Sequence, residues 1–281
     1  MDPEFRNKED SAGYFPDYDT ALEYARNVSE SAYHQDRLRA LTYLTDKLKK
    51  EELHTVLDYG VGDGGEFLQL SLNPKKLIGI DISPHMIEIS KTTIPSNIEY
   101  LPFVGSTETL RLVDSESIDL FLCINVIGYL SESEREDLFN QINRIIRKGG
   151  YFLVMTGNEL FNLFALNSGT ASFFARHFSQ SESTIADLLS ESRTSRIKNA
   201  TSDNPIAFKH DLINYGFKEI NQAFSQWHEI PPALANKKYA NLREARAKAR
   251  NHDVNPNVFP PHEKWKALFC CSIFASLSIK E

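Results

Sequence analysis

Short apolar runs alternate with amphipathic segments through the middle of the chain. The runs are rich in Val, Ile, Leu and Phe, as buried strands are, and they cover residues 55–58, 76–81, 98–104, 118–125 and 151–156. The segments between them space their apolar residues as helices do, near residues 66–72, 84–91 and 131–147. Strands that alternate with helices in this way form parallel βαβ units, whose helices cover both faces of the sheet. The pattern therefore predicts an α/β fold with a doubly wound sheet.

The rest of the chain flanks this core. A helix is predicted over residues 31–50, with Arg37 mostly off its apolar face. That face is formed by Leu38, Leu41, Leu44 and Leu48. Residues 7–30 are polar with scattered tyrosines and show no strand pattern. Beyond residue 157 the alternation stops, and the pattern predicts helices over 208–215 and 233–250 and strands over 217–230 and 267–279.

A cluster of four glycines follows the first predicted strand, in the segment VLDYGVGDGG. Glycine lets the backbone turn sharply there and lets a ligand approach the amides that open the next helix. The spacing of Gly60, Gly62 and Gly65 fits the dinucleotide fingerprint. The spacing of Asp58, Gly60, Gly62 and Gly64 fits a second pattern, an acidic residue followed by alternating glycines. The glycines alone do not decide between the two patterns.

Two carboxylates help to distinguish the ligands. Asp58 ends the first strand two residues before Gly60, where it would repel a pyrophosphate but attract an ammonium or sulfonium group. Asp81 ends the second strand, where a carboxylate can accept hydrogen bonds from both hydroxyls of a ribose. A cation beside the first strand and a ribose beside the second indicate S-adenosylmethionine. A nicotinamide dehydrogenase is the alternative that the glycine spacing permits.

In its motifs the chain resembles the class I, Rossmann-like S-adenosylmethionine-dependent methyltransferases. Five segments carry the resemblance over residues 53–156, in the order LDYGVGDGG, GIDISPHMIEISK, VGSTETL, IDLFLCINVIGYL and IIRKGGYFLV. A weaker match over residues 205–281 includes LINYGFKEI and FCCSIFASLSIK, which in this family form an antiparallel hairpin at the sheet edge. The resemblance implies one domain over residues 7–281, with a mostly parallel seven-stranded sheet, helices on both faces and a C-terminal antiparallel hairpin.

The resemblance also implies which residues hold the methionine and ribose parts of the cofactor. Asp58 and Gly60 would lie beside the methionine part. Gly62 and Gly64 would form the tight turn, and Asp81 would bind the ribose.

Further residues are implied along the adenine and at the reacting end. Those expected along the adenine are Ile82 and Met86 on its face and Ser106, Thr107 and Glu108 near its edge. Many relatives carry Asp in place of Ser106, so the contact to the adenine amino group departs from the family pattern. Asn125, at the end of the fourth strand, would lie near the methyl-transfer centre.

The acceptor side carries fewer signals. Residues 31–156 are expected to form the cofactor-binding core, and insertions at 157–205 and 233–262 are expected to form a cap over the acceptor pocket. Methyl transfer to oxygen needs a base, a metal or close positioning. The catalytic residues predicted from the sequence are His177, in the segment SFFARHF, and Tyr129, just past the fourth strand.

A basic segment supplies the remaining signal about the acceptor. Between residues 237 and 250 the basic residues are Lys237, Lys238, Arg243, Arg246, Lys248 and Arg250, against Glu244 alone. This segment fits either a solvated helix face or a contact for an anionic acceptor. We expect a small-molecule or glycan acceptor of anionic character, methylated on a hydroxyl of a sugar, nucleotide sugar or polysaccharide. The alternatives are another small metabolite and a catalytically silent cofactor-binding scaffold.

Composition limits the setting in which the protein works. The 281 residues have a net charge of −7, which does not favour binding to nucleic acid. Cys123, Cys270 and Cys271 form neither a disulfide framework nor a metal-binding spacing, so we expect no metal and a cytoplasmic location. No apolar run reaches the roughly 18 residues of a transmembrane helix, so no membrane insertion is expected. Residues 1–6, which begin MDPEF, resemble the remnant of an expression vector.

Overall fold

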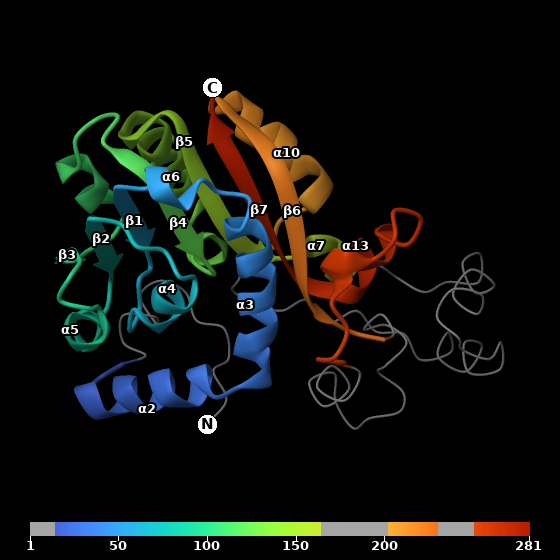
Figure 1. The fold of residues 1–281 in the computed structure, drawn as a ribbon, viewed down its shortest axis with the longest axis horizontal. Helices are drawn as coiled ribbons and strands as arrows, with labels where there is room; N and C mark the ends of the chain where they lie inside the picture. Colours follow the sequence, from blue (N-terminus) through green and yellow to red (C-terminus); the bar gives the residue numbers. More distant parts are fainter. Residues whose placement is uncertain (1–14, 164–201, 230–249) are drawn as a thin grey trace.

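The computed structural model describes residues 15–163, 202–229 and 250–281. Seven strands form one sheet in the order β3-β2-β1-β4-β5-β7-β6 (Figure 1). They are β1 (Thr55–Tyr59), β2 (Lys76–Asp81), β3 (Glu99–Val104), β4 (Ile118–Ile124), β5 (Ile146–Gly157), β6 (Phe217–Trp227) and β7 (Cys271–Lys280). β1 to β5 pair in parallel, and β7 runs antiparallel to both β5 and β6. The predicted doubly wound, mostly parallel sheet with a C-terminal antiparallel hairpin is confirmed.

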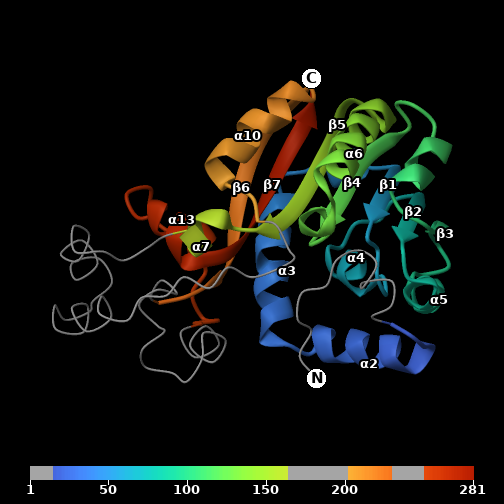
Figure 2. The same ribbon diagram turned by 180° about the vertical axis from the view of Figure 1, so that it is seen from behind.

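Helices cover both faces of the sheet, as Figures 1 and 2 show from opposite sides. The α-helices are α2 (Tyr18–Ser29), α3 (Ala32–Thr45), α4 (Gly65–Gln69), α5 (Pro84–Thr93), α6 (Glu132–Ile145), α7 (Glu159–Leu163), α10 (Pro205–Asn214) and α13 (Trp265–Cys270). Short 3₁₀ helices are η1 (Lys50–Glu52), η2 (Thr107–Leu112), η3 (Ile127–Tyr129) and η4 (Pro256–Val258). Within the described ranges, none of the helices has both the length and the apolar character that a membrane span requires.

Two hydrophobic cores explain why the strands read as continuous apolar runs. Neighbouring residues of a strand point to opposite faces of the sheet. Val56 and Leu120 belong to the core that α3 and α4 cover, whereas Leu57 and Phe121 belong to the core that α6 and α10 cover. All residues of β4 are buried. Burying each large apolar side chain contributes about 1.5–3 kcal/mol, so both faces stabilise the sheet.

Polar side chains fix the points at which helices begin. Ser83 accepts a hydrogen bond from the amide of Met86, and Pro84 is the first residue of α5. The predicted capping box opens α6: Ser131 Oγ accepts from the amide of Glu134 at 3.3 Å, and Glu134 Oε2 accepts from the amide of Ser131 at 3.0 Å. Each cap satisfies amides that the helix itself leaves without partners, which is worth about 1 kcal/mol.

Three local features differ from the sequence prediction. Helix α2 forms in the polar N-terminal segment, where the sequence predicts no regular element. The first residues of the strand predicted over 267–279 form α13 instead, and β7 begins at Cys271, the first residue that pairs with β6. Gly149 and Gly150, expected to end α6, lie inside β5 where its register with β4 shifts.

Candidate functional site

The carboxyl ends of the parallel strands meet at one edge of the sheet, and the predicted cofactor residues follow these ends. Asp58 lies in β1, Asp81 ends β2, and Asn125 follows β4 directly. Because β1 is central and pairs with both β2 and β4, these three positions lie next to one another. Helix α2 crosses below this edge in Figure 1, beneath α4 and α5. The edge at the reversal of strand order is where open α/β sheets bind ligands.

The turn between β1 and α4 takes its shape from three glycines. Gly60, Gly62 and Gly64 have φ angles of +86°, +53° and +78°, in the left-handed region that favours glycine. A Cβ on Gly60 would lie 2.2 Å from Cγ2 of Val126, whereas a Cβ on Gly62 would meet nothing within 4 Å. Gly65 is the first residue of α4 and has no positive φ. The left-handed glycines are therefore those of the acidic-x-Gly-x-Gly-x-Gly pattern.

Asp81 ties the first two strand ends together. Its Oδ2 accepts from the amide of Gly62 at 2.9 Å, and its Oδ1 accepts from the amide of Ser83 at 2.8 Å. Burial raises the pKa of this carboxyl, and the hydrogen bonds from Ser83 and Gly62 oppose that rise. Each carboxylate oxygen keeps a second lone pair, so Asp81 can still accept from hydroxyl groups of a ligand.

Asp58 is the most perturbed carboxyl at this edge. It is 4% exposed, and burial first, followed by the charges of Glu66, Asp81 and Asp63, raises its pKa to about 8. Four carboxyl groups thus surround the glycine turn. An anionic ligand would be repelled there, whereas a cationic ligand would favour the ionised form of each acid.

An arginine that the sequence places off the apolar face of its helix proves to be buried beside this acidic group. The side chain of Arg37 in α3 is 10% exposed, and its Nη2 lies 3.6 Å from Oε1 of Glu66 and 3.1 Å from Nδ1 of His34. Its Nε is buried and has no hydrogen-bond partner among the described residues. Arg37 also lies over the ring of Tyr33, with 5.1 Å between the guanidinium carbon and the ring centroid. Sequence spacing gives no signal for this arginine, because its burial depends on how α3 packs beside α4.

The residues expected along the adenine lie on two separate segments. Ser106 is buried, and its amide donates to Glu108 Oε1 at 3.1 Å, while its hydroxyl donates to the other oxygen of the same carboxylate. Thr107 is buried and Glu108 is exposed. Ile82 is partly buried next to Asp81.

Met86, the remaining adenine prediction, joins the site to the N-terminal helix. It is 4% exposed and packs in a small cluster with Ala21 of α2 and Ile89 of α5. Phe15 and Leu22 pack against the same cluster. Helix α2 therefore contacts a residue that is expected at the adenine, although the sequence gives no helical signal for α2.

Asn125 has an unusual backbone conformation for its residue type. Its φ is +58°, and its amide donates to the carbonyl of Met155 at 2.8 Å. Its Nδ2 is buried without a hydrogen-bond partner among the described residues. Tyr129 ends η3 and is partly buried. His177, the first predicted catalytic residue, lies outside the described residues, as do Lys237, Lys238, Arg243, Arg246 and Lys248 of the basic segment.

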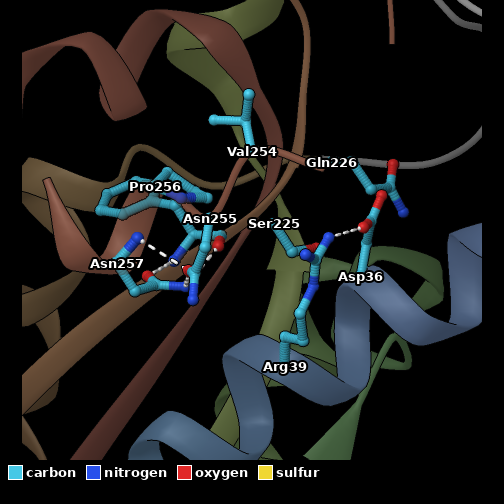
Figure 3. Close-up of a pocket in the computed structure, with 9 residues that line it drawn as sticks. Asp36, Arg39, Ser225, Gln226, Val254, Asn255, Pro256 and Asn257 are labelled. Carbon is cyan, nitrogen blue, oxygen red and sulfur yellow. Dashed lines mark hydrogen bonds and ion pairs between the residues drawn. The ribbon is translucent and has the colours of Figure 1, made fainter. Parts of the chain in front are cut away.

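A polar recess lies on the other side of α3, between this helix, β6 and η4 (Figure 3). Arg39 donates to Asp36 Oδ1 within it, and Asp36 Oδ2 also contacts Nδ1 of His252. None of the predicted cofactor residues lines this recess. It holds residues 250–258 against α3 and leaves the glycine turn as the site of the expected chemistry.

Comparison with known proteins agrees with this geometry. Residues 57–154, from β1 to β5, match the model of a family described as a methyltransferase domain. No curated protein matches the chain significantly.

Solved structures with a similar fold extend the comparison over almost the whole chain. Magnesium protoporphyrin IX methyltransferase from Synechocystis PCC 6803, with bound S-adenosylhomocysteine, is 11% identical with a TM-score of 0.56, covering 98% of this chain and 100% of that one. The N-methyltransferase NodS from Bradyrhizobium japonicum WM9, in complex with S-adenosylhomocysteine, is 11% identical with a TM-score of 0.50, covering 90% of each chain. The [4+2]-cyclase SpnF is 14% identical with a TM-score of 0.51, covering 89% of this chain and 84% of that one. At these identities the likeness concerns the fold.

The predicted family is confirmed for the core of the chain. Residues 57–154 form a methyltransferase domain, and they carry the glycine turn and both strand-end carboxylates. The fold around this domain is the class I, Rossmann-like fold of S-adenosylmethionine-dependent methyltransferases.

Proposed function

We propose that this protein transfers the methyl group of S-adenosylmethionine to a hydroxyl group of a sugar, nucleotide sugar or polysaccharide. The observation that carries the cofactor assignment is the acidic glycine turn, where Asp58 is buried beside Asp81 and three left-handed glycines leave open space above Gly62. This arrangement favours a cation beside β1 and a ribose beside β2.

The charges around the turn fit the zwitterionic methionine part of the cofactor. Asp58 and Glu66 favour the ammonium and sulfonium groups, and Arg37 is the buried cation that can pair with the carboxylate. The free Nε of Arg37 supports this role, because a guanidinium binds a carboxylate best through two parallel donors. A dinucleotide would instead place its pyrophosphate beside Asp58, where the charges repel.

The chemistry asks for orientation more than for activation. S-adenosylmethionine brings a methyl group that its sulfonium already activates for displacement. The chain has to align an acceptor oxygen with that methyl group, exclude water and accept the proton of the hydroxyl. Asn125, Tyr129 and His177 are the residues we propose for this acceptor side, with Asn125 supported by its strained backbone and its buried amide nitrogen.

The choice of acceptor rests on charge rather than on the fold. Proteins of this fold include a porphyrin methyltransferase, an N-methyltransferase and a cyclase, so the fold does not select an acceptor. The excess of basic residues between 237 and 250 supports an anionic sugar derivative.

Two measurements test the proposal. Calorimetric titration should show binding of S-adenosylhomocysteine and none of NAD, and Asp81→Ala should weaken binding of S-adenosylhomocysteine at least about tenfold through lost charge-assisted hydrogen bonds. Tight NAD binding without S-adenosylhomocysteine binding would contradict the cofactor assignment. Incubation with methyl-labelled cofactor and a panel of nucleotide sugars and glycans should give a labelled product. A panel that stays unlabelled, while a lysate fraction free of glycans becomes labelled, would contradict the acceptor class.

A further inference from the structure

A second arginine lies on the ring that Arg37 contacts. Arg250 follows β6 at the carboxyl edge of the sheet, and it forms an isolated antiparallel bridge with His228. Its guanidinium carbon lies 5.3 Å from the ring centroid of Tyr33, against 5.1 Å for Arg37. Tyr33 is thus a shared platform that joins the glycine-turn side of the site to the side of β6.

Arg250 lacks the partner that a desolvated guanidinium normally has. Its Nε is buried without a hydrogen-bond partner among the described residues. Burial lowers its pKa, while the nearby charges of Tyr33 and Asp36 oppose that shift. A guanidinium has five N–H donors, and removing them from water without acceptors is costly.

The nearest acidic candidate is already engaged. Asp36 is 4% exposed and accepts from Arg39 through Oδ1, while its Oδ2 contacts Nδ1 of His252. Figure 3 shows Arg39 and Asp36 paired on α3 beside Ser225. Both oxygens of Asp36 therefore serve the contact between α3 and the segment that carries His252, and Arg250 is left to pair with a group from outside the chain.

We infer that Arg250, stacked on Tyr33, binds an oxyanion of the methyl acceptor, a carboxylate or a phosphate group. The inference rests on the proposed function, and it divides the two arginines by role. Arg37 lies beside Glu66 at the glycine turn and serves the cofactor, whereas Arg250 lies beside β6 and serves the acceptor. A guanidinium held flat on an aromatic ring presents its edge to a planar or tetrahedral oxyanion, which gives two parallel hydrogen bonds.

The geometry makes Arg250 a residue that selects the acceptor. The contacts run from Glu66 to Arg37 at 3.6 Å and then through Tyr33 to Arg250, so the oxyanion would bind one aromatic ring away from the methionine part of the cofactor. An acceptor without a negative charge would leave the buried Nε of Arg250 without a partner, and it would bind more weakly.

The test uses protein saturated with S-adenosylhomocysteine, so that the cofactor side is filled. Inorganic phosphate and D-glucuronate are titrated separately, with glucose as the neutral control, and binding is followed by calorimetry or by ³¹P NMR for phosphate. We expect saturable binding of at least one oxyanion and none of glucose. The two arms distinguish a phosphate from a carboxylate as the preferred group. Arg250→Gln should weaken oxyanion binding at least about tenfold.

Two further variants separate recognition from a folding effect. Arg250→Lys keeps the positive charge and should retain more oxyanion affinity than Arg250→Gln. Arg111→Gln removes an exposed cation on η2 and should bind as the parent does. The inference is overturned if neither oxyanion binds saturably, if Arg250→Gln binds as the parent does, or if the Lys and Gln variants lose affinity equally. Titration of the same samples with S-adenosylhomocysteine keeps the two claims apart, because failure of that titration contradicts the proposed function instead.

Discussion

At the scale of single residues, Asp58 gives the site a dependence on pH. In the folded chain this carboxyl has a pKa of about 8, against 3.8 for an ordinary aspartate. Between these values the folded chain holds a proton that the unfolded chain has lost. The free energy of unfolding therefore falls as pH rises, by about 1.4 kcal/mol per pH unit from this group, and the loss levels off above pH 8.

Asp58→Asn should remove this contribution. Urea unfolding of the parent and the variant at pH 6, 7 and 8, without cofactor, should show the parent losing stability relative to the variant at each step. Saturating S-adenosylhomocysteine should reduce the difference, because its ammonium group would favour the ionised carboxyl. Asp114→Asn, at an exposed position, is the control. Parallel pH profiles for the parent and Asp58→Asn would contradict the raised pKa.

The two central glycines of the turn should respond differently to the same added methyl group. Gly60→Ala places a Cβ 2.2 Å from Val126, so it should destabilise the fold by several kcal/mol (about 1–3 for the forced overpacking alone). Gly62→Ala meets no neighbour within 4 Å and should cost about 1 kcal/mol for its positive φ. The methyl group on residue 62 would nevertheless occupy space that we assign to the cofactor. Gly62→Ala should therefore unfold near the parent and lose most of its affinity for S-adenosylhomocysteine; undiminished affinity would place the cofactor elsewhere.

At the scale of elements, the last strand fixes the end of a helix on the opposite part of the fold. Lys280 of β7 donates through Nζ to the carbonyls of Asn143 and Ile146, at 2.6 and 2.8 Å, at the carboxyl end of α6. These carbonyls lie where a helix has unsatisfied acceptors and a negative dipole end. Lys280→Met should lower the free energy of unfolding by about 1–3 kcal/mol, measured in urea. Lys218→Met, whose parent side chain is 71% exposed, should change it by less than about 0.5 kcal/mol, and equal losses would argue against a specific role for Lys280.

Elements were predictable from sequence where local pattern and final packing agree. β2 is bounded as predicted, and the capping box marks the start of α6, because both signals lie within the elements themselves. The segment over 267–279 was not, because its apolar residues suit a helix or a strand equally. Pairing with Trp227 decides that β7 begins at Cys271, and such a partner lies far away in sequence.

At the scale of the whole molecule, the same distinction separates the legible part of the site from the rest. Asp58, the glycines and Asp81 are readable because each follows directly on a strand whose end must lie at the carboxyl edge. Arg37, Tyr33 and Arg250 come together only when α3 and the segment after β6 pack at that edge. A charged residue on a helix reads as solvent-exposed until the neighbouring element is known. Sequence therefore predicts the cofactor half of the site better than the acceptor half.

Helix α2 offers a test of how far cofactor binding reaches through the molecule. It crosses the carboxyl edge in Figure 1 and is held there by a small cluster in which Ala21 packs with Met86 and Ile89. So few buried apolar contacts predict that α2 opens at low free energy. If the adenine packs on Met86 as we expect, binding should stabilise the docked helix by up to about 2.7 kcal/mol at a ligand concentration 100 times Kd.

Hydrogen exchange followed by mass spectrometry measures this coupling directly. S-adenosylhomocysteine should slow exchange in α2 as well as in the glycine turn, while α10, which packs on the other face of the sheet, should exchange as before. Met86→Ala should weaken the effect on α2 more than the effect on the turn, because it removes the contact between them. Protection confined to the turn would mean that α2 does not sense the cofactor, and that Met86 serves only to pack α5.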